Sequence, residues 1–129
     1  MQKKISSFTS LKAWQEAHRL SLSVYKVLPE FPKYEQFGLS DQIRRSVTSI
    51  SANISEGFGR KGRKDKIQFY YIANGSLAET QNHLLLARDL GYIKQEQFKE
   101  LANQTVFISK LINGLIKSIR EADKVEGRK

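Results

Sequence analysis

Glycines and cations between residues 57 and 66 are the residues best placed to do chemistry in this sequence. The segment 57–62 has the sequence GFGRKG and matches the G-x-G-x-x-G dinucleotide fingerprint letter for letter. That fingerprint requires a strand before it and a helix that opens within it. The preceding residues repeat with helical spacing instead. A Rossmann nucleotide site is therefore rejected, and the glycines are assigned to a tight turn.

The same segment is strongly basic, which makes it a candidate for phosphate binding. Its cations are Arg60, Lys61, Arg63, Lys64 and Lys66, against Asp65 alone. A glycine-rich loop with dense positive charge can follow a phosphate backbone, and N–H groups at a nearby helix N-terminus add to the attraction. The other interpretation is a solvated mobile loop with no binding role, and the sequence leaves both open.

Arg44 and Arg45 are adjacent cations on a predicted helix, and they cannot both lie on its apolar stripe. A structural interpretation pairs one arginine with Glu56 or Glu79, whereas a functional interpretation makes it a phosphate contact. We favour a structural role for one, Arg45, and leave the other open as a phosphate contact. The candidate nucleic-acid residues are therefore Arg44, Arg60, Lys61, Arg63, Lys64 and Lys66.

Other patterns that carry chemistry are weak here. The only histidines are His18 and His83, cysteine is absent, and neither Glu16 with His18 nor Glu79 with His83 has the Glu-x-x-His spacing of di-iron bundles. There is no G-x-S-x-G elbow, and the Asp residues are scattered along the chain, whereas nucleases gather carboxylates around metal ions. We predict a non-enzymatic protein with no catalytic, metal or cofactor site, and no cofactor.

Base stacking is a further possibility for the aromatic residues. Phe58 is the most interesting candidate because it lies within the basic segment. Tyr71 is a second candidate. Trp14 and Tyr70 lie on apolar stripes and are assigned to the core or to an interface.

Hydrophobic periodicity predicts four helices and no strand, which gives an all-α, antiparallel up-and-down four-helix bundle. The bundle covers residues 10–122, with helices at about 10–28, 40–57, 65–90 and 95–121. Residues 1–9 are an N-terminal arm and residues 123–129 a charged tail.

Local signals mark the helix ends. Pro29 and Pro32 end the first helix because proline lacks the N–H that a helix interior needs. Gly57 suits the left-handed residue after the second helix, and Gly91 stops the third. The third helix opens at Asp65, which forms a capping-box pattern with Gln68. The connection after the first helix carries three aromatic residues expected to be buried: Phe31, Tyr34 and Phe37.

The predicted third and fourth helices carry more apolar surface than an isolated bundle buries. The third has the row Phe69, Ala73, Ser76, Thr80, His83, Ala87 and Leu90, with Tyr70, Leu77 and Leu84 beside it. The fourth has Val106, Phe107, Leu111 and Ile116 outside its main stripe. We expect other subunits to cover the excess, which predicts a homo-oligomer. A wider intramolecular core is the alternative.

Composition narrows the class of partner and the compartment. The 129 residues include 22 Lys and Arg against 13 Asp and Glu, for a net charge of +9 and a pI near 9.9. This excess favours polyanions as partners, with plain solubility as the other interpretation. The absence of cysteine fits a reducing cytoplasm. No secretory signal or membrane-length apolar run is visible, so a cytoplasmic protein with no membrane partner is expected.

Short motifs follow one another in a fixed order along nearly the whole chain. They are Phe8, Leu11, Trp14 and Ala17; Phe31-Pro32, Glu35 and Gly38-Leu39; Gln42-Ile43-Arg44-Arg45, Ser49-Ile50, Asn53-Ile54 and Glu56-Gly57; and Phe69, Gly75-Ser76, Glu79 and Leu90-Gly91-Tyr92. In this combination the sequence resembles the four-helix-bundle proteins of the 23S rRNA intervening-sequence family. The motif residues taken as structural are Trp14, Gln42, Arg45, Asn53, Glu56, Gly57, Ser76 and Glu79.

The resemblance implies a bacterial cytoplasmic protein of four antiparallel helices that forms a ring-like homo-oligomer, a pentamer as in related members. Relatives in diversity-generating retroelements look like nucleic-acid-binding accessory proteins of a reverse transcriptase. The pattern at residues 53–57, Asn-Ile-x-Glu-Gly, instead belongs to the intervening-sequence branch. A reverse-transcriptase role is therefore not expected, and no catalytic residues carry over.

The leading hypothesis is a basic homo-oligomeric bundle that binds RNA or DNA through its phosphates without reading the base sequence. The rival is a protein-interaction scaffold or accessory subunit that makes no direct contact with nucleic acid. In that case the apolar excess would dock a partner, and the charge would serve solubility.

Overall fold

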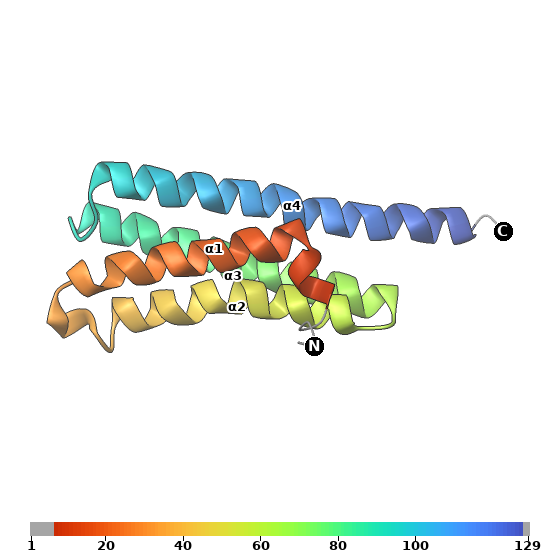
Figure 1. Ribbon diagram of the computed structural model, residues 1–129, viewed down its shortest axis with the longest axis horizontal. Coiled ribbons are helices and arrows are strands. Elements are labelled where there is room, and N and C mark those ends of the chain that lie inside the picture. The colour runs from red at the N-terminus through yellow and green to blue at the C-terminus, as the bar shows by residue number, and fades with distance from the viewer. Residues whose placement is uncertain (1–6, 128–129) are drawn as a thin grey trace, which may run out of the picture.

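The computed structural model describes residues 7–127, and these form four long helices joined by short connections (Figure 1). The helices are α1 (Lys12–Val27), α2 (Leu39–Gly59), α3 (Arg63–Asp89) and α4 (Gln95–Gly127). Each packs against the helix before and after it, and α1 also packs against α4. The predicted all-α four-helix bundle is confirmed, and the described residues contain no strand.

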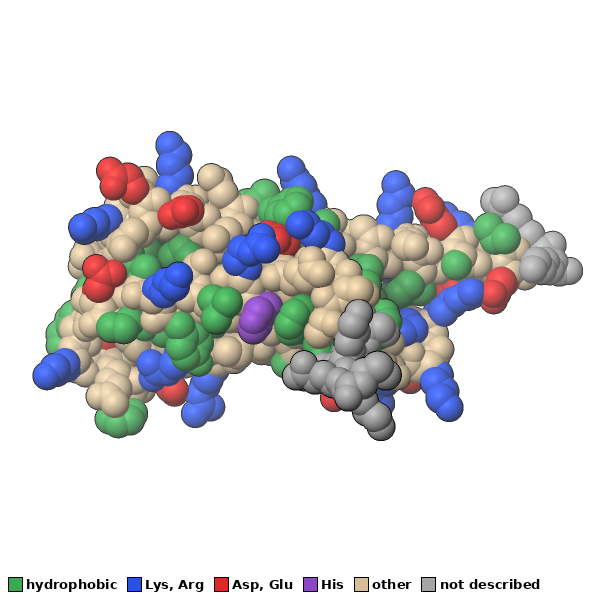
Figure 2. All heavy atoms as spheres, viewed as in Figure 1, with side chains coloured by type: hydrophobic (Ala, Val, Ile, Leu, Met, Phe, Trp, Pro, Cys, Tyr) green, Lys and Arg blue, Asp and Glu red, His purple; other side chains and the backbone are tan. Residues whose placement is uncertain are grey.

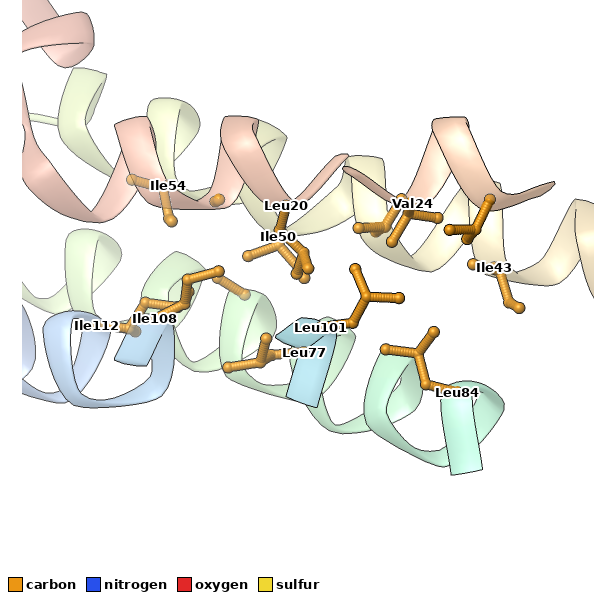
Figure 3. Close-up of a cluster of buried hydrophobic side chains, with 14 of the residues drawn as sticks. Leu20, Val24, Ile43, Ile50, Ile54, Leu77, Leu84, Leu101, Ile108 and Ile112 are labelled. Atoms are coloured by element: carbon orange, nitrogen blue, oxygen red, sulfur yellow. The ribbon is translucent and has the colours of Figure 1, made fainter. Parts of the chain in front are cut away.

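The core follows heptad spacing, which keeps one seam of each helix turned inward as the helices wind around each other. On α3 the buried residues are Tyr70, Ala73, Leu77, Thr80, Leu84 and Ala87. Figure 3 shows side chains from all four helices meeting in this core, including Leu20, Ile50, Leu77 and Ile108. The predicted α3 row was partly wrong, because the inward seam runs through Tyr70, Leu77 and Leu84, whereas Phe69, His83 and Leu90 flank it.

Gly57 is not the residue after a helix end, because α2 continues through it to Gly59 and no described residue other than Gly91 has a positive φ. A Cβ atom on Gly57 would stand 2.7 Å from the ring of Tyr70. Close approach of α3, and not a left-handed backbone, is therefore what requires glycine here. Gly91 has φ +79° and ends α3 as predicted.

Two other predicted boundaries differ from the structure. The third helix begins at Arg63 after Gly62, with no side-chain cap, so the capping box at Asp65 was wrong. Helix α4 continues to Gly127, past the predicted end at residue 121. Its last turns project beyond the α2–α3 turn (Figure 1). The predicted N-terminal arm lies mostly outside the described residues, and Ser7–Ser10 form a short 3₁₀ helix.

The connection between α1 and α2 contains two short 3₁₀ helices, η2 (Leu28–Glu30) and η3 (Lys33–Glu35). Phe31 is buried as predicted, at 6% exposure. The expectation was wrong for Tyr34 and Phe37, which are 77% and 88% exposed. Because Phe31 and Leu39 already fill the space under the connection, no core volume remains for the other two rings.

Candidate nucleic-acid interface

The basic segment is mostly helical and not a long mobile loop. Only residues 60–62 separate α2 from α3, so Arg63, Lys64 and Lys66 lie in the first turns of α3. A short connection between antiparallel helices fixes the direction in which each side chain leaves the backbone. The predicted flexible phosphate-tracking loop is therefore replaced by a tight helical hairpin.

Two cations of this hairpin are used to hold it together. Lys66 donates from Nζ to the carbonyl oxygens of Gly57 at 3.3 Å and Phe58 at 2.6 Å. Those carbonyls lie in the last turn of α2, where the Gly57 carbonyl also accepts the Arg60 N–H at 3.3 Å, so the ammonium acts as a C-terminal cap. Its Nζ also lies 5.4 Å from the centre of the Phe58 ring, so Phe58 is already occupied by an internal cation.

The Arg60 side chain is held in a similar way. Its guanidinium donates to Glu56 at 3.3 Å and lies 4.6 Å from the centre of the Phe69 ring. The ion pair is exposed and contributes little stability by itself. Together with the ring contact it fixes the direction of Arg60 along the hairpin.

Arg63 connects the hairpin to the far end of the chain. Its guanidinium donates to Asp123 at 3.0 Å and to Glu126 at 2.6 Å. The hydrogen bond that Arg63 donates to Glu126 makes the largest contribution to raising the pKa of Arg63 above its ordinary value, and the one to Asp123 makes the next largest. The two carboxylates lie one helical turn apart on α4. The cross-link gives a physical reason for α4 to stay helical beyond residue 121.

Arg44 does not join the other candidates. It lies near the start of α2, so the distance to Arg60 along the helix is about 24 Å at 1.5 Å per residue. Its guanidinium donates to the carbonyl of Gln36 at 2.9 Å and lies 3.7 Å from Asp41. Arg45 pairs with Asp41 at 3.0 Å. The predicted arginine partners were wrong, because both arginines pair with Asp41, whereas Glu56 pairs with Arg60 and Glu79 contacts His83.

Lys61 and Lys64 remain available at the hairpin. Both are exposed, and neither has a hydrogen bond or ion pair within the described part of the chain. Lysine presents a hydrated point charge on a flexible stem, so an unpaired lysine is free to meet a phosphate. Of the predicted cluster, these two side chains keep that freedom.

A groove along α3 and α4 adds cations that sequence reasoning missed. It has a volume of about 330 Å³ and lies between Tyr71 and the α4 residues Lys117, Arg120 and Lys124. Arg120 donates to the Tyr71 hydroxyl, and its guanidinium lies 5.4 Å from the centre of that ring. Residues 117, 120 and 124 are three and four apart, which is a one-face helical pattern that the sequence already contained.

The register of the two helices brings this groove beside the hairpin. The antiparallel pairing is marked by Asn74 with Asn113 at 2.9 Å and by Arg63 with Asp123. Residues near 117–124 of α4 therefore run alongside the first turns of α3. Figure 2 shows basic and acidic side chains interleaved along the projecting end of α4. The surface is thus a set of spaced lysines and not a continuous basic patch.

Motif residues of α2 and α3 form a polar seam between the two helices. Ser76 donates to Ser49 at 2.9 Å, and Thr80 donates to Ser46 at 2.9 Å. Asn53 donates to the Ser49 hydroxyl at 2.9 Å, which orients that serine. These short side chains let the backbones approach closely while every buried hydroxyl in the seam finds a partner. The seam is structural and holds no base beside a serine.

The remaining motif residues lie around the bundle. The Trp14 ring is half-buried and stacks on His18, with ring centres 4.8 Å apart. Glu79 lies 3.4 Å from His83. Gln42 is exposed, and its side chain makes no hydrogen bond within the described residues. The described residues contain no group of His, Asp and Glu that could hold a metal ion.

The arrangement defines a small basic four-helix bundle with a polar α2–α3 seam and a capped hairpin. Residues 9–114 match the family model of the 23S rRNA-intervening sequence protein, and the chain belongs to that family. A solved structure with 30% sequence identity is a protein of unknown function from the S23 ribosomal protein family of Bacteroides thetaiotaomicron VPI-5482. It aligns with a TM-score of 0.76 over 81% of this chain and 98% of that chain. A search of curated proteins finds no match.

One further property bears on the class of protein. Among residues 7–127, no helix combines the length and apolar character that crossing a membrane requires.

Proposed function

We propose that the protein is a non-enzymatic, cytoplasmic homo-oligomer that binds RNA or DNA through the phosphate backbone. The observation that carries the proposal is the set of exposed, unpaired lysines at one end of the bundle, namely Lys61, Lys64, Lys117 and Lys124. Each can neutralise one phosphate and release its counterion. None forms an ion pair with a carboxylate of residues 7–127.

The cations at this end of the bundle fall into two groups, one paired within the protein and one unpaired, and this supports the proposal. Arg60, Arg63 and Lys66 hold the hairpin, so they set its shape and leave binding to the lysines around them. Phosphate contacts made by such point charges position a nucleic acid without reading its sequence. Binding should therefore be strong at low salt and nearly independent of base sequence.

Exposed apolar side chains on α3 and α4 support self-assembly. They are Tyr71, Ile72, Leu85, Leu86, Leu90, Val106, Phe107 and Val125, each 42–58% exposed. An apolar hollow of about 210 Å³ lies among them, lined by Leu84, Leu85, Phe98 and Val106. Exposed apolar side chains gathered around such a hollow favour a protein interface. A ring of subunits, a pentamer by family resemblance, would also repeat the lysines around its circumference.

The test compares two lysine pairs that carry equal charge at opposite ends of the bundle. Anisotropy with a labelled DNA duplex would be measured over a range of salt concentrations. Lys61→Gln with Lys64→Gln should weaken binding and lower the log–log salt slope by about 2, since each neutralised phosphate contributes roughly 0.9. The control, Lys94→Gln with Lys99→Gln, removes the same charge and should leave the slope nearly unchanged.

The scaffold remains the second candidate because the apolar hollow on α3 and α4 could take a partner protein. The scaffold predicts that substituting either lysine pair changes neither assembly nor the anisotropy measured with nucleic acid. Absence of binding to every RNA and DNA probe at low salt would remove the phosphate proposal and leave the scaffold.

A further inference from the structure

Two aromatic rings on the α1–α2 connection lie outside the core. Phe37 and Tyr34 have the highest exposure of the large hydrophobic side chains in the described structure, at 88% and 77%. No contact between the two rings is present within residues 7–127, so each presents an open face. They lie three residues apart, and in a tight 3₁₀-like turn that spacing puts side chains on the same side.

The backbone that carries these rings is firmly anchored. The Tyr34 hydroxyl lies 2.8 Å from that of Tyr92, which donates to Glu35 at 2.9 Å. Glu35 also accepts the N–H of Leu39 at 3.1 Å, at the start of α2. Beneath them the Phe31 ring packs 5.3 Å from the Tyr92 ring. The backbone of the connection and the Tyr34 ring are therefore held in place before any partner arrives, which lowers the entropic cost of binding.

The charges around the connection complement an anion. Lys26 and Lys33 are exposed and have no ion pair among the described residues. The nearby carboxylates already have partners, since Glu30 accepts from Gln97, Glu35 from Leu39 and Tyr92, and Asp41 from Arg45. Lys26 and Lys33 therefore carry positive charge that no carboxylate of the described residues pairs with, whereas Asp41 pairs with Arg45, and Glu30 and Glu35 accept hydrogen bonds from neutral groups.

A groove of about 340 Å³ lies between the end of α1 and the start of α2, and the connection contributes Lys33 and Gln36 to its lining. Its floor includes Leu28 and Phe31, the half-exposed ring of Tyr25 lines one wall, and Lys33 and Arg44 stand at the rim. Figure 2 shows hydrophobic side chains beside basic ones at this end of the molecule. Flat apolar surfaces next to cations match the two parts of a nucleotide, its base and its phosphate.

We propose that the α1–α2 connection is a stacking site for unpaired bases of single-stranded nucleic acid, with Tyr34 and Phe37 as platforms and Lys33 as a phosphate contact. The site rests on the proposed nucleic-acid function but is separate from the lysines at the α2–α3 hairpin. It also makes single strands with accessible bases the preferred substrate class over duplexes.

The experiment uses two fluorescent oligonucleotides of equal length, one of adenylates and one abasic, so that phosphates are matched and only bases differ. The native protein should bind the adenylate strand more tightly. Tyr34→Ala with Phe37→Ala should reduce that binding by roughly 5- to 100-fold, the range that alanine substitution gives for base–aromatic stacking. Binding of the abasic strand should be unchanged.

Conservative variants serve as controls that keep a flat ring. Phe37→Trp and Tyr34→Phe should retain the preference for bases, and all variants should keep the native circular dichroism and solution mass. Equal affinity of the native protein for both strands would overturn the stacking site and leave phosphate binding intact. Failure to bind either strand would overturn both. A lower solution mass for the alanine variant would show a contact between subunits and so reject the site.

Discussion

The two ends of the bundle present charge and aromatic rings in opposite ways. At the α2–α3 end, the aromatic rings contact cations of the same hairpin, since Lys66 lies over Phe58 and Arg60 over Phe69. At the α1–α2 end, Tyr34 and Phe37 face solvent and have no cation over them within the described residues. The first end therefore offers free lysines and occupied rings, and the second offers free rings.

The comparison teaches that residue type alone does not define a binding surface. Arginine is the usual choice for phosphate recognition because its fork is rigid and bidentate. Here every arginine of the described chain has an internal partner, such as Asp41 for Arg45 or Asp89 for Arg88. Geometry leaves the weaker phosphate ligand, lysine, as the available one. We therefore expect modest, salt-sensitive affinity rather than tight recognition.

The largest expected effect breaks the close packing of the hairpin end. In Gly57→Ala the new Cβ would lie 2.7 Å from the Tyr70 ring and 3.1 Å from the Phe69 Cβ. Tyr70 is only 3% exposed and has no room to yield, so the variant should lose about 1–3 kcal/mol of stability. Chemical denaturation measures the loss.

Gly75→Ala is the matched control for that variant. Gly75 lies inside α3, and an added Cβ there meets nothing within 4 Å. Replacing glycine by alanine in an open helical position should raise stability by up to ~1 kcal/mol. Equal effects at the two positions would show that helix propensity, and not contact with α3, decides the role of Gly57.

The sequence predicted the fold better than it predicted the candidate site. Helical spacing, Pro29 and Gly91 were enough to predict four helices and most of their limits. The prediction for Gly57 was wrong because glycine suits both a left-handed backbone and a close approach between helices. Only the position of the neighbouring helix shows which of the two roles glycine has here. A one-dimensional pattern does not contain the position of Tyr70.

The candidate site was harder to predict because residues far away in the sequence decide whether each cation is free or paired. Arg63 seemed free since the carboxylates that bind it, Asp123 and Glu126, lie some sixty residues away. By contrast, the helical spacing of Lys117, Arg120 and Lys124 was readable and was overlooked beside the denser run at the hairpin. The exposure of Phe37 was not readable, because the sequence does not tell how much core Phe31 already fills.

A smaller effect, on pH dependence, sharpens the contrast between the two ends. The pKa of Tyr92 is raised above its ordinary value of 10.0, chiefly by the hydrogen bond with Tyr34, then by burial and by Glu35. The pKa of Tyr70, at the other end, is raised by burial. Folding favours the neutral phenols, so their stabilising contribution is present below about pH 10 and is lost as pH rises through the folded pKa values.

We therefore expect Tm to fall as pH rises above about pH 10, less steeply in Tyr92→Phe than in the native protein. Tyrosinate absorbance would follow the phenols directly. In the native protein some tyrosines should ionise only above the ordinary pKa of tyrosine, and after unfolding all should ionise near it. An identical fall in Tm for the native protein and Tyr92→Phe would place the alkaline sensitivity elsewhere.

The smallest expected effect tests whether the hairpin holds the projecting end of α4. Arg63→Gln removes the ion pairs to Asp123 and Glu126, whose carboxylates are 52% and 60% exposed. Exposed pairs contribute about 0–1 kcal/mol, so global stability should hardly change. Amide exchange should nevertheless become faster over residues 120–127, because these last turns pack on little else. Lys64→Gln, which removes a neighbouring charge without a partner, should leave that exchange unchanged. If both variants exchange alike, α4 is helical there by its own propensity, and Arg63 is free to join the lysines as a phosphate contact.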